Sequence, residues 1–193
     1  MEKRGAQMIT VVIFLTILVT YIVILATYKP QSRYRNGMLF SIKLPAQAME
    51  HPDIRRIQAE YDRRFNRVSL VMALLLVPMI LLYKFTTYQF VYLFAWLTVF
   101  FIVMVLPFRK AFRDTLTLKK ASEWANQADE DEYWANGFSY HNPKDPRVFV
   151  DKRVGVGLTV NTGTLAGKLI MGGTVALFAA VVLGVSVTMI RSA

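Results

Sequence analysis

The sequence predicts an all-α membrane protein with four transmembrane helices, helical cytoplasmic extensions and a small β-hairpin cap. Three observations support this prediction. The chain is 54% hydrophobic and only 19% charged over 193 residues, which is too apolar for an ordinary soluble domain of this size. Its apolar residues gather in four long stretches. Its cations gather in two of the loops between those stretches.

The apolar stretches run from Met8 to Tyr28, Val68 to Tyr83, Tyr88 to Phe108 and Leu169 to Ile190. Each approaches the roughly 20 residues of helix that cross a hydrocarbon core. The first is expected to be retained, because no convincing small-residue cleavage site follows it. The chain then divides into a first transmembrane helix at 1–28, a basic cytoplasmic loop and helix at 29–67, a transmembrane hairpin at 68–108, a cytoplasmic helix and β-rich cap at 109–166, and a fourth transmembrane helix at 167–193.

The second and third stretches are separated only by KFTT and should form a tight antiparallel hairpin. Helical spacing continues beyond both stretches, at Ile54, Ile57 and Tyr61 on one side and at Phe112, Leu116 and Trp124 on the other. The predicted product is a helical stalk. Pro52 suits the start of that stalk, and Pro78 is expected to bend the second span, because its ring and missing N–H interrupt a turn.

The distribution of Lys and Arg predicts the orientation of the chain. Residues 29–67 hold nine of these cations and residues 109–168 hold ten, whereas the opposite face holds Lys3, Arg4, Lys84 and Arg191. The positive-inside rule therefore places both large loops in the cytoplasm and both termini outside a bacterial plasma membrane. The net charge of +10 is then explained by topology and anionic lipid, and no nucleic-acid partner is expected.

Few residues suggest chemistry. No Asp, Glu, Lys, Arg or His lies within the apolar stretches, which disfavours a proton relay or an ion path. The chain has no Cys, so thiol catalysis and Cys-based zinc sites are excluded. The acid run 129–132 has the oxygens that a divalent cation needs, but such runs are usually solvated. Ser139, His141 and Asp145 can be drawn as a triad, yet no motif poses the serine as a nucleophile. No catalytic residue, metal or cofactor is predicted.

The segment 137–161 is typical of short strands: GFSYH, the turn NPKDP, then RVFV and VGVGLTVN. Strand alternation would place two sets of side chains on opposite faces of the last strand. One face would hold Val154, Val156, Leu158 and Val160, and the other Gly155, Gly157, Thr159 and Asn161. A glycine face allows a ring, a headgroup or another backbone to come close, or it packs beneath the stalk. The neighbouring aromatic and basic residues would suit a hairpin on the membrane surface.

The fourth stretch is expected to begin after a capping hydroxyl, from Thr162 or Thr164. Small residues recur every four positions along it, at Gly172, Ala176, Ala180 and Gly184. Such a stripe lets another helix approach closely in lipid. It either packs within the chain or forms the seam of a homodimer.

Two passages resemble known families. The passage 32–65 resembles the loop of SdpI-like bacterial membrane proteins, in which an Asn and a Gly precede a short apolar run, a Pro, an acidic stretch and a basic helix; SIKLP stands here where that family has an Arg-Thr-Pro-Trp core. The passage 131–161 is similar to a short domain of unknown function at the end of Gram-positive membrane proteins. The motifs behind this second resemblance are Tyr133-Trp134, Gly137, Asn142-Pro143, Asp145-Pro146-Arg147, Lys152-Arg153, Gly155 and Gly157. The first resemblance implies immunity to a secreted peptide toxin, or a membrane sensor that sequesters a repressor. The second implies no chemistry.

We therefore expect a non-enzymatic polytopic membrane protein whose cytoplasmic cap and stalk bind anionic lipid, a protein partner or a second copy. Its role would be sensing, toxin immunity or that of an accessory subunit. The expected contact residues are Arg55, Arg56, Arg63, Arg64, Lys119, Lys120, Phe138, Tyr140, Lys152, Arg153, Gly155 and Gly157. One alternative is a dimeric transporter or scramblase for a lipid or peptide, with a polar groove lined by Thr10, Thr16, Thr20 and Thr98. Another is an enzyme that acts on membrane phosphates through Asp131, His141 and Asp145.

Overall fold

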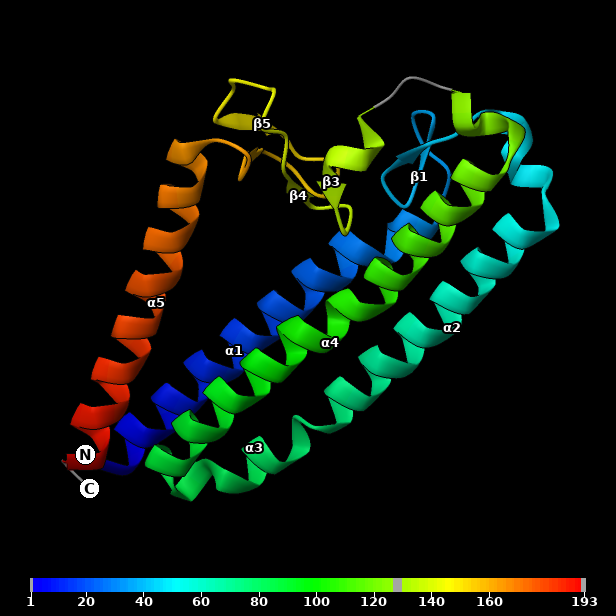
Figure 1. Ribbon diagram of the computed structural model, residues 1–193. Helices are drawn as coiled ribbons and strands as arrows, with labels where there is room; N and C mark the ends of the chain where they lie inside the picture. The colour runs from blue at the N-terminus through cyan, green and yellow to red at the C-terminus, as the bar shows by residue number, and fades with distance from the viewer. Residues whose placement is uncertain (1, 127–129, 192–193) are drawn as a thin grey trace.

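The computed structural model describes residues 2–126 and 130–191. Helices α1 (Glu2–Tyr28), α2 (Pro52–Leu74) and α4 (Thr86–Ala121) form a bundle, and α5 (Leu165–Arg191) stands apart from it (Figure 1). Small β-hairpins lie at one end of the molecule, which we call the cap end. Helix α1 begins and α5 ends at the opposite end. Both long loops therefore lie at one end, as four spans require.

Four helices in the described part of the chain are long and apolar enough to span a membrane. They coincide with the predicted stretches. The second is interrupted: α2 ends at Leu74, and the short α3 (Val77–Leu81) begins with Pro78 in its first turn. Proline cannot donate to the carbonyl four residues earlier, and that carbonyl belongs to Leu74. The predicted bend at Pro78 is confirmed.

Side chains of α4 bind backbone carbonyls on the α2 side of this break. The indole Nε1 of Trp96 donates to the carbonyl of Met72 at 3.1 Å, and the hydroxyl of Tyr92 donates to that of Leu75. Within hydrocarbon, an unpaired backbone carbonyl costs several kcal/mol. The break is therefore tolerated because the neighbouring helix supplies donors. The turn η3 (Leu82–Lys84) then closes the hairpin to α4.

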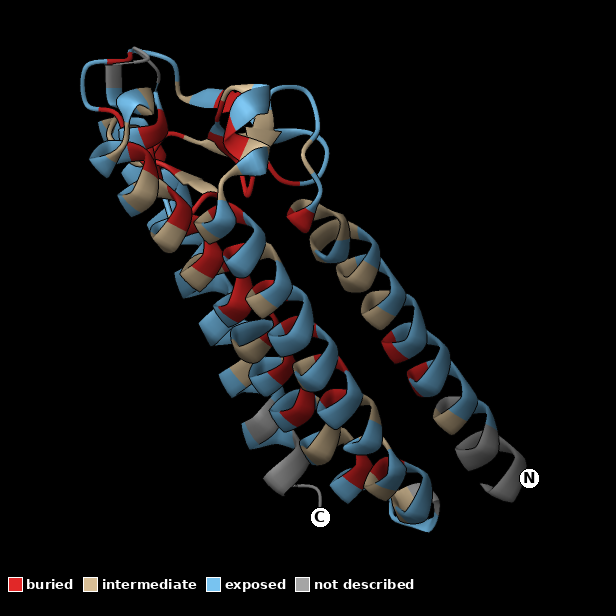
Figure 2. Cartoon of the chain, turned by 90° about the vertical axis from the view of Figure 1, so that its right-hand side faces the viewer, coloured by how far each residue is buried: buried red, intermediate tan, exposed pale blue. Residues whose placement is uncertain are grey.

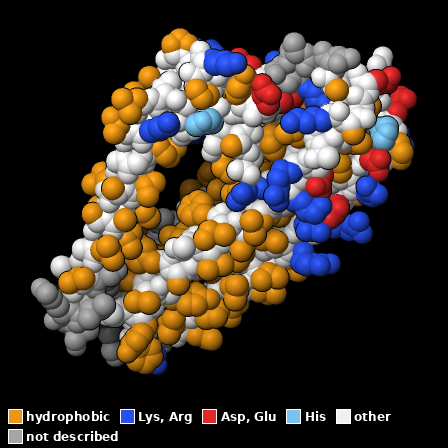
Figure 3. Space-filling model, viewed as in Figure 1, with side chains coloured by type: hydrophobic (Ala, Val, Ile, Leu, Met, Phe, Trp, Pro, Cys, Tyr) orange, Lys and Arg blue, Asp and Glu red, His pale blue; other side chains and the backbone are white. Residues whose placement is uncertain are grey.

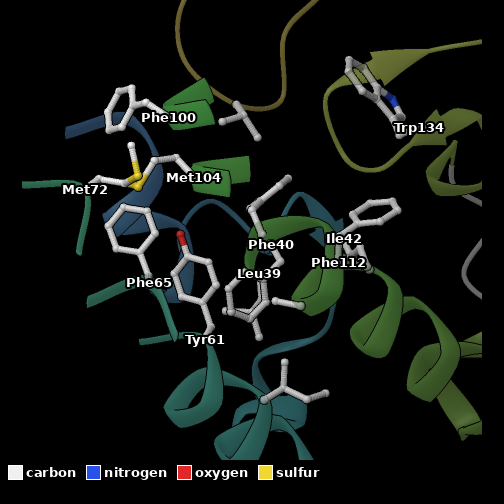
Figure 4. Close-up of a cluster of buried hydrophobic side chains, with 14 of the residues drawn as sticks. Leu39, Phe40, Ile42, Tyr61, Phe65, Met72, Phe100, Met104, Phe112 and Trp134 are labelled. Atoms are coloured by element: carbon white, nitrogen blue, oxygen red, sulfur yellow. The ribbon is translucent and has the colours of Figure 1, made fainter. Parts of the chain in front are cut away.

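The predicted stalk is confirmed at the cap end. The residues buried on α2 recur at helical spacing, as Ile54, Ile57, Tyr61 and Phe65, and buried residues follow the helices from end to end (Figure 2). Tyr61 and Phe65 lie beside residues of α4 and of the first hairpin (Figure 4). The ring of Phe40 meets that of Tyr61 edge-on at 5.0 Å. The apolar core therefore continues past the long apolar stretch and into the cap.

The stalk helix α4 ends earlier than its apolar spacing predicts. At Ser122 the backbone becomes extended, while the hydroxyl donates to the carbonyl of Lys119 at 2.9 Å and accepts the N–H of Trp124 at 3.3 Å. Trp124 consequently lies in the 3₁₀ turn η4 (Glu123–Asn126) and packs edge-on against the ring of His51 at 5.6 Å.

Three antiparallel hairpins form the cap in the described chain. They are β1 (Met38–Leu39) with β2 (Ile42–Lys43), β3 (Trp134–Ala135) with β4 (Ser139–Tyr140), and β5 (Phe149–Asp151) with β6 (Leu158–Val160). Short 3₁₀ turns connect them to the helices, namely η1 (Lys29–Ser32), η2 (Ala46–Glu50) and η5 (Asp131–Tyr133). A parallel bridge from Tyr140 to Asn161 joins the second hairpin to the third.

The strand predicted over VGVGLTVN is wrong in its first half. Strand β6 begins at Leu158, and the residues before it form the hairpin loop. Gly155 and Gly157 have φ of +80° and +99°, a region that residues with a Cβ rarely adopt. Val156 is 97% exposed at the loop tip. The two glycines turn the chain and do not form a flat strand face.

Most of the described side chains of helix α5 are exposed. Thr164, the second of the two predicted caps, is its cap residue: its hydroxyl accepts the N–H of Gly167 at 3.0 Å. The predicted small-residue stripe is exposed, and a Cβ added at Gly172 or Gly184 would meet nothing within 4 Å. Figure 3 shows an opening between α5 and the bundle. Packing of this stripe inside the chain is thus not found among the described residues, and the homodimer seam stays a prediction.

Candidate functional site: the cap and the stalk

A buried carboxylate joins the cap to the stalk. Asp131 is 2% exposed and accepts hydrogen bonds from Nζ of Lys119 at 2.7 Å and from the backbone N–H of Lys43 at 3.2 Å. Its other oxygen pairs with the guanidinium of Arg153. Lys119 lies at the end of α4, Lys43 on β2, and Arg153 in the β5–β6 loop. One side chain therefore fixes three segments that are distant in the sequence.

The guanidinium of Arg153 is held from several sides. Its Nη1 also donates to the carbonyl of Ser41 at 2.8 Å, and the group lies over the buried ring of Trp134 at 5.0 Å from the centroid. A buried charge is tolerated only when it is paired and hydrogen-bonded. Lys119, which was expected to contact a partner, thus lies inside the molecule at 4% exposure. Arg153, also expected to contact a partner, instead binds other residues of the cap.

A second polar centre lies around the fully buried Asn161. Its Nδ2 donates to the carbonyls of Asn142, Asp145 and Arg147 at 3.0, 3.0 and 3.1 Å. Its Oδ1 accepts the backbone N–H groups of Asn142 and Gly163 at 3.0 and 2.9 Å. One amide side chain therefore organises the predicted NPKDP turn from within.

The same residue positions the start of α5. The carbonyl oxygen of Asn161 accepts the hydroxyl of Thr164 at 3.0 Å. A Cβ built on Gly167 would lie 1.9 Å from that carbonyl oxygen, so only glycine allows this approach. The turn, β6 and the first turn of α5 form one packed unit.

The Asp145 carboxylate adds further hydrogen bonds within this unit. It accepts from Nη2 of Arg147 at 2.7 Å, from the backbone N–H of Arg147 at 3.0 Å and from the hydroxyl of Tyr140 at 3.1 Å. The hydrogen bonds from Arg147 hold the pKa of Asp145 well below its usual range. Burial raises the pKa of the Tyr140 phenol. Tyr140 is 1% exposed, so its expected place on a recognition surface is wrong.

The other predicted contact residues do lie on the surface. Exposed side chains are Arg55, Arg56, Arg63, Arg64, Lys120 and Lys152, and Gly155 and Gly157 are exposed in their loop. Phe138 is half-buried, with its ring 6.4 Å from that of Phe108. Arg56 and Arg64 make local pairs with Asp53 at 3.1 Å and Glu60 at 2.6 Å. Exposed pairs of this kind contribute little, so these cations remain available to a ligand.

The residues considered as candidate catalysts each contact a different partner. Nδ1 of His141 is 3.1 Å from the hydroxyl of Thr162, whereas Asp145 faces Arg147 and Asp131 faces Lys119. No group of three metal-ligating residues is found in the described chain. Of the predicted acid run, Asp129 lies outside the described residues. The triad Ser139, His141 and Asp145 is not assembled by the contacts that these residues make.

The predicted threonine groove is present only in part. Thr16, Thr20 and Thr98 each donate to the carbonyl four residues earlier in their own helix. Thr10 instead donates to Oε1 of the buried Gln89 at 3.2 Å. These two residues border a groove of about 630 Å³ between α1 and α3 whose other lining side chains are apolar.

Several residues of this region were not foreseen. Asn161 was placed on a strand face, and nothing in its sequence context distinguishes a buried amide from an exposed one. A polar pocket of about 260 Å³ is lined by Arg33, Arg35, Ser41 and Arg153, among others. Arg33 and Arg35, in SRYRNG shortly after the first span, are the sequence feature that could have indicated this pocket.

The fold is mostly helical, with four helices able to span a membrane and β-hairpins at one end. Residues 143–168 of the chain match a family of unknown function, DUF5808. This match overlaps the passage that resembles a short terminal domain, and it covers residues 143–146 of the NPKDP turn, β5, β6 and the start of α5. No curated protein and no solved structure matches the chain. The resemblance of residues 32–65 to SdpI-like proteins stays a prediction.

Proposed function

We propose that this chain is a non-enzymatic multi-pass protein of a bacterial plasma membrane that binds an acidic partner through its cytoplasmic end. The observation that supports the proposal is the segregation of charge. Exposed Lys and Arg side chains gather over the cap and stalk, whereas hydrophobic side chains cover the rest of the visible face (Figure 3). By the positive-inside rule this end faces the cytoplasm.

The arrangement of the cap favours binding over catalysis. Its polar side chains are used to hold the backbone, as at Asp131 and Asn161. The result is a rigid platform that presents cations from α2 and from the β5–β6 loop. A preorganised surface loses little conformational entropy on association. Complementary charge also speeds encounter with an acidic partner.

Charge reversal tests this proposal. Lys120→Glu with Lys152→Glu removes two exposed cations without touching the buried cluster, and we expect loss of the partner's co-purification in mild detergent. Lys84→Glu, at the opposite end of the molecule, is the matched control and should leave recovery unchanged. Equal recovery of the partner with the double variant and with the control would contradict the proposal. The proposed roles in sensing or toxin immunity are then decided by the identity of the partner, which mass spectrometry gives.

An accessory-subunit role has independent support in α5. This helix is exposed along its described length and carries the small-residue stripe, so a helix of a second chain can approach it closely. We include a second copy of this chain among its candidate partners. Crosslinking along the stripe distinguishes the two cases by the mass of the product.

A second candidate function, lipid handling, is favoured by the groove between α1 and α3. An apolar groove open to the bilayer fits an acyl chain, and the polar pair of Thr10 and Gln89 lies within it. If the chain is a scramblase, Gln89→Leu should slow the transfer of a fluorescent phospholipid in reconstituted vesicles at least several-fold. Protein-dependent transfer that this substitution leaves unchanged would exclude the groove as the path.

A further inference from the structure

The pocket of about 260 Å³ lies where two segments distant in the sequence meet, residues 30–41 and the β5–β6 loop. Arg33 comes from the chain just after η1, Arg35 and Ser41 from the first hairpin region, and Arg153 and Gly155 from the β5–β6 loop. Since a water molecule occupies about 30 Å³ in the liquid, this volume accommodates a phosphate group together with several waters.

Its charge is of one sign. Among the described residues that line it, three are arginines and none is acidic. Arg33 and Arg35 are exposed, and no ion pair or side-chain hydrogen bond engages either of them in the described part of the chain. Guanidinium groups bind phosphate oxygens with paired N–H donors. Two of the three arginines are therefore available to an anion from outside.

Ser41, which lines the pocket, carries a buried hydroxyl that has no partner among the described residues. Ser41 is 3% exposed, and its Oγ is buried without a hydrogen bond. Such buried unsatisfied polar atoms are rare in folded proteins and require an explanation. A bound anion would supply the acceptor that this hydroxyl lacks.

The backbone that carries Ser41 is also unusual. Phe40 and Ser41 have φ of +48° and +68°, in a turn that normally uses Asn and Gly. The buried ring of Phe40 and the hydrogen bond from Arg153 to the Ser41 carbonyl hold this conformation. Strain of this kind gathers at ligand-binding positions, and Ser41 is one of the residues that line the pocket.

The level of the pocket identifies the source of the anion. A Cβ on Gly155 would lie 3.8 Å from Cγ2 of Thr27, in the last turn of α1. Pro30 and Gln31, which directly follow that helix, also line the pocket. Because the apolar span ends here, the pocket lies at the depth of lipid headgroups.

We infer that this pocket binds the phosphate group of an anionic phospholipid, with Arg33 and Arg35 as the charged contacts, Ser41 as a hydroxyl donor and Arg153 as the preorganised wall. The inference rests on the proposed membrane-embedded function and gives it a lipid ligand, at residues distinct from those proposed to bind the protein partner.

Native mass spectrometry of the full-length, delipidated protein with phosphatidylglycerol or phosphatidylcholine tests the inference. The wild type should retain phosphatidylglycerol preferentially. Arg33→Gln with Arg35→Gln should lower that retention about 30-fold, because each cation near an anionic lipid contributes a factor of about five. Arg67→Gln with Arg113→Gln removes the same charge at two exposed positions outside the pocket and should change retention less than about two-fold, because solvent and salt screen exposed charges that do not touch the ligand. Arg153 is left intact, since its loss would disrupt the buried cluster.

Ser41→Ala provides a second variant, with an expected loss of about ten-fold or more from one hydrogen bond to a charged group. Equal loss in both arginine pairs, or no preference of the wild type for phosphatidylglycerol, would overturn the inference. Displacement of the lipid by millimolar inorganic phosphate that itself binds through Arg33 and Arg35 would assign the pocket to soluble phosphate and overturn the lipid source. Loss of partner recovery in the Lys120 and Lys152 variants is a separate readout, so either proposal can fail alone.

Discussion

Replacing Asp131 by Asn should detach the cap from the stalk. The substitution keeps the shape of the side chain and one acceptor oxygen, so the hydrogen bond from the Lys43 backbone can persist. It removes the negative charge between Lys119 and Arg153, whose side chains are 4% and 9% exposed. Two cations would then lie buried beside each other without the carboxylate that pairs them.

The magnitude follows from this burial. Removing one partner of a buried ion pair typically costs about 3–5 kcal/mol. Since about 1.36 kcal/mol corresponds to a tenfold change in an equilibrium, opening of the cap should become about 150- to 5000-fold more frequent. Amide hydrogen exchange reports this opening directly. The expected increase lies in β1 to β4, while exchange within the bundle helices stays unchanged.

Two further variants make the test decisive. Glu132→Gln alters the exposed neighbour and should shift the opening free energy by less than about 0.5 kcal/mol. Adding Lys119→Met to Asp131→Asn should recover part of the loss, because it removes a buried unpaired charge. If cap exchange in Asp131→Asn stays within about three-fold of the wild type, less than 1 kcal/mol by the same conversion, the cluster does not hold the cap and our reasoning fails.

Three further outcomes are expected. Gly167→Ala should destabilise the start of α5 by about 3 kcal/mol or more, since its Cβ would overlap a backbone carbonyl; normal helix protection in hydrogen exchange would contradict this. Asp145 has a folded-state pKa below the ordinary value of 3.8 for an aspartate, so its pairing with Arg147 contributes stability that is present above that value and is lost as the pH falls below it. An Asp145→Asn variant should lack this acid dependence in circular dichroism titrations, and an unchanged titration would argue against the pairing. Gly172→Leu should abolish a dimer formed through the stripe while Gly173→Leu, one position off it, should not; identical sedimentation of the two would exclude that seam.

Much of the fold was predictable because hydrocarbon imposes simple rules. Span positions, the bend at Pro78 and the stalk followed from apolar length, a missing N–H and helical spacing. The early end of α4 was not predictable, because a Ser inside a periodic segment terminates the helix only when its hydroxyl competes for backbone groups. The loop at Gly155 and Gly157 was taken for a strand since alternation alone cannot reveal positive φ.

The site was harder to predict than the fold. Lys119 and Arg153 have the same sequence signature as the exposed Lys120 and Lys152, and only tertiary packing decides which cation is buried. Tyr140 was expected outside and lies inside for the same reason. The pocket residue Ser41 carries no local signal at all, because its significance depends on Arg33 and Arg153 arriving from other segments.

The proposed partner binding and lipid binding both depend on the side of the membrane on which the cap end lies. The chain has no native Cys, so single-cysteine variants report cleanly. With a membrane-impermeant maleimide, Lys152→Cys should be labelled only in inverted vesicles and Lys84→Cys only in intact cells. Labelling of Lys152→Cys from outside intact cells would contradict the account.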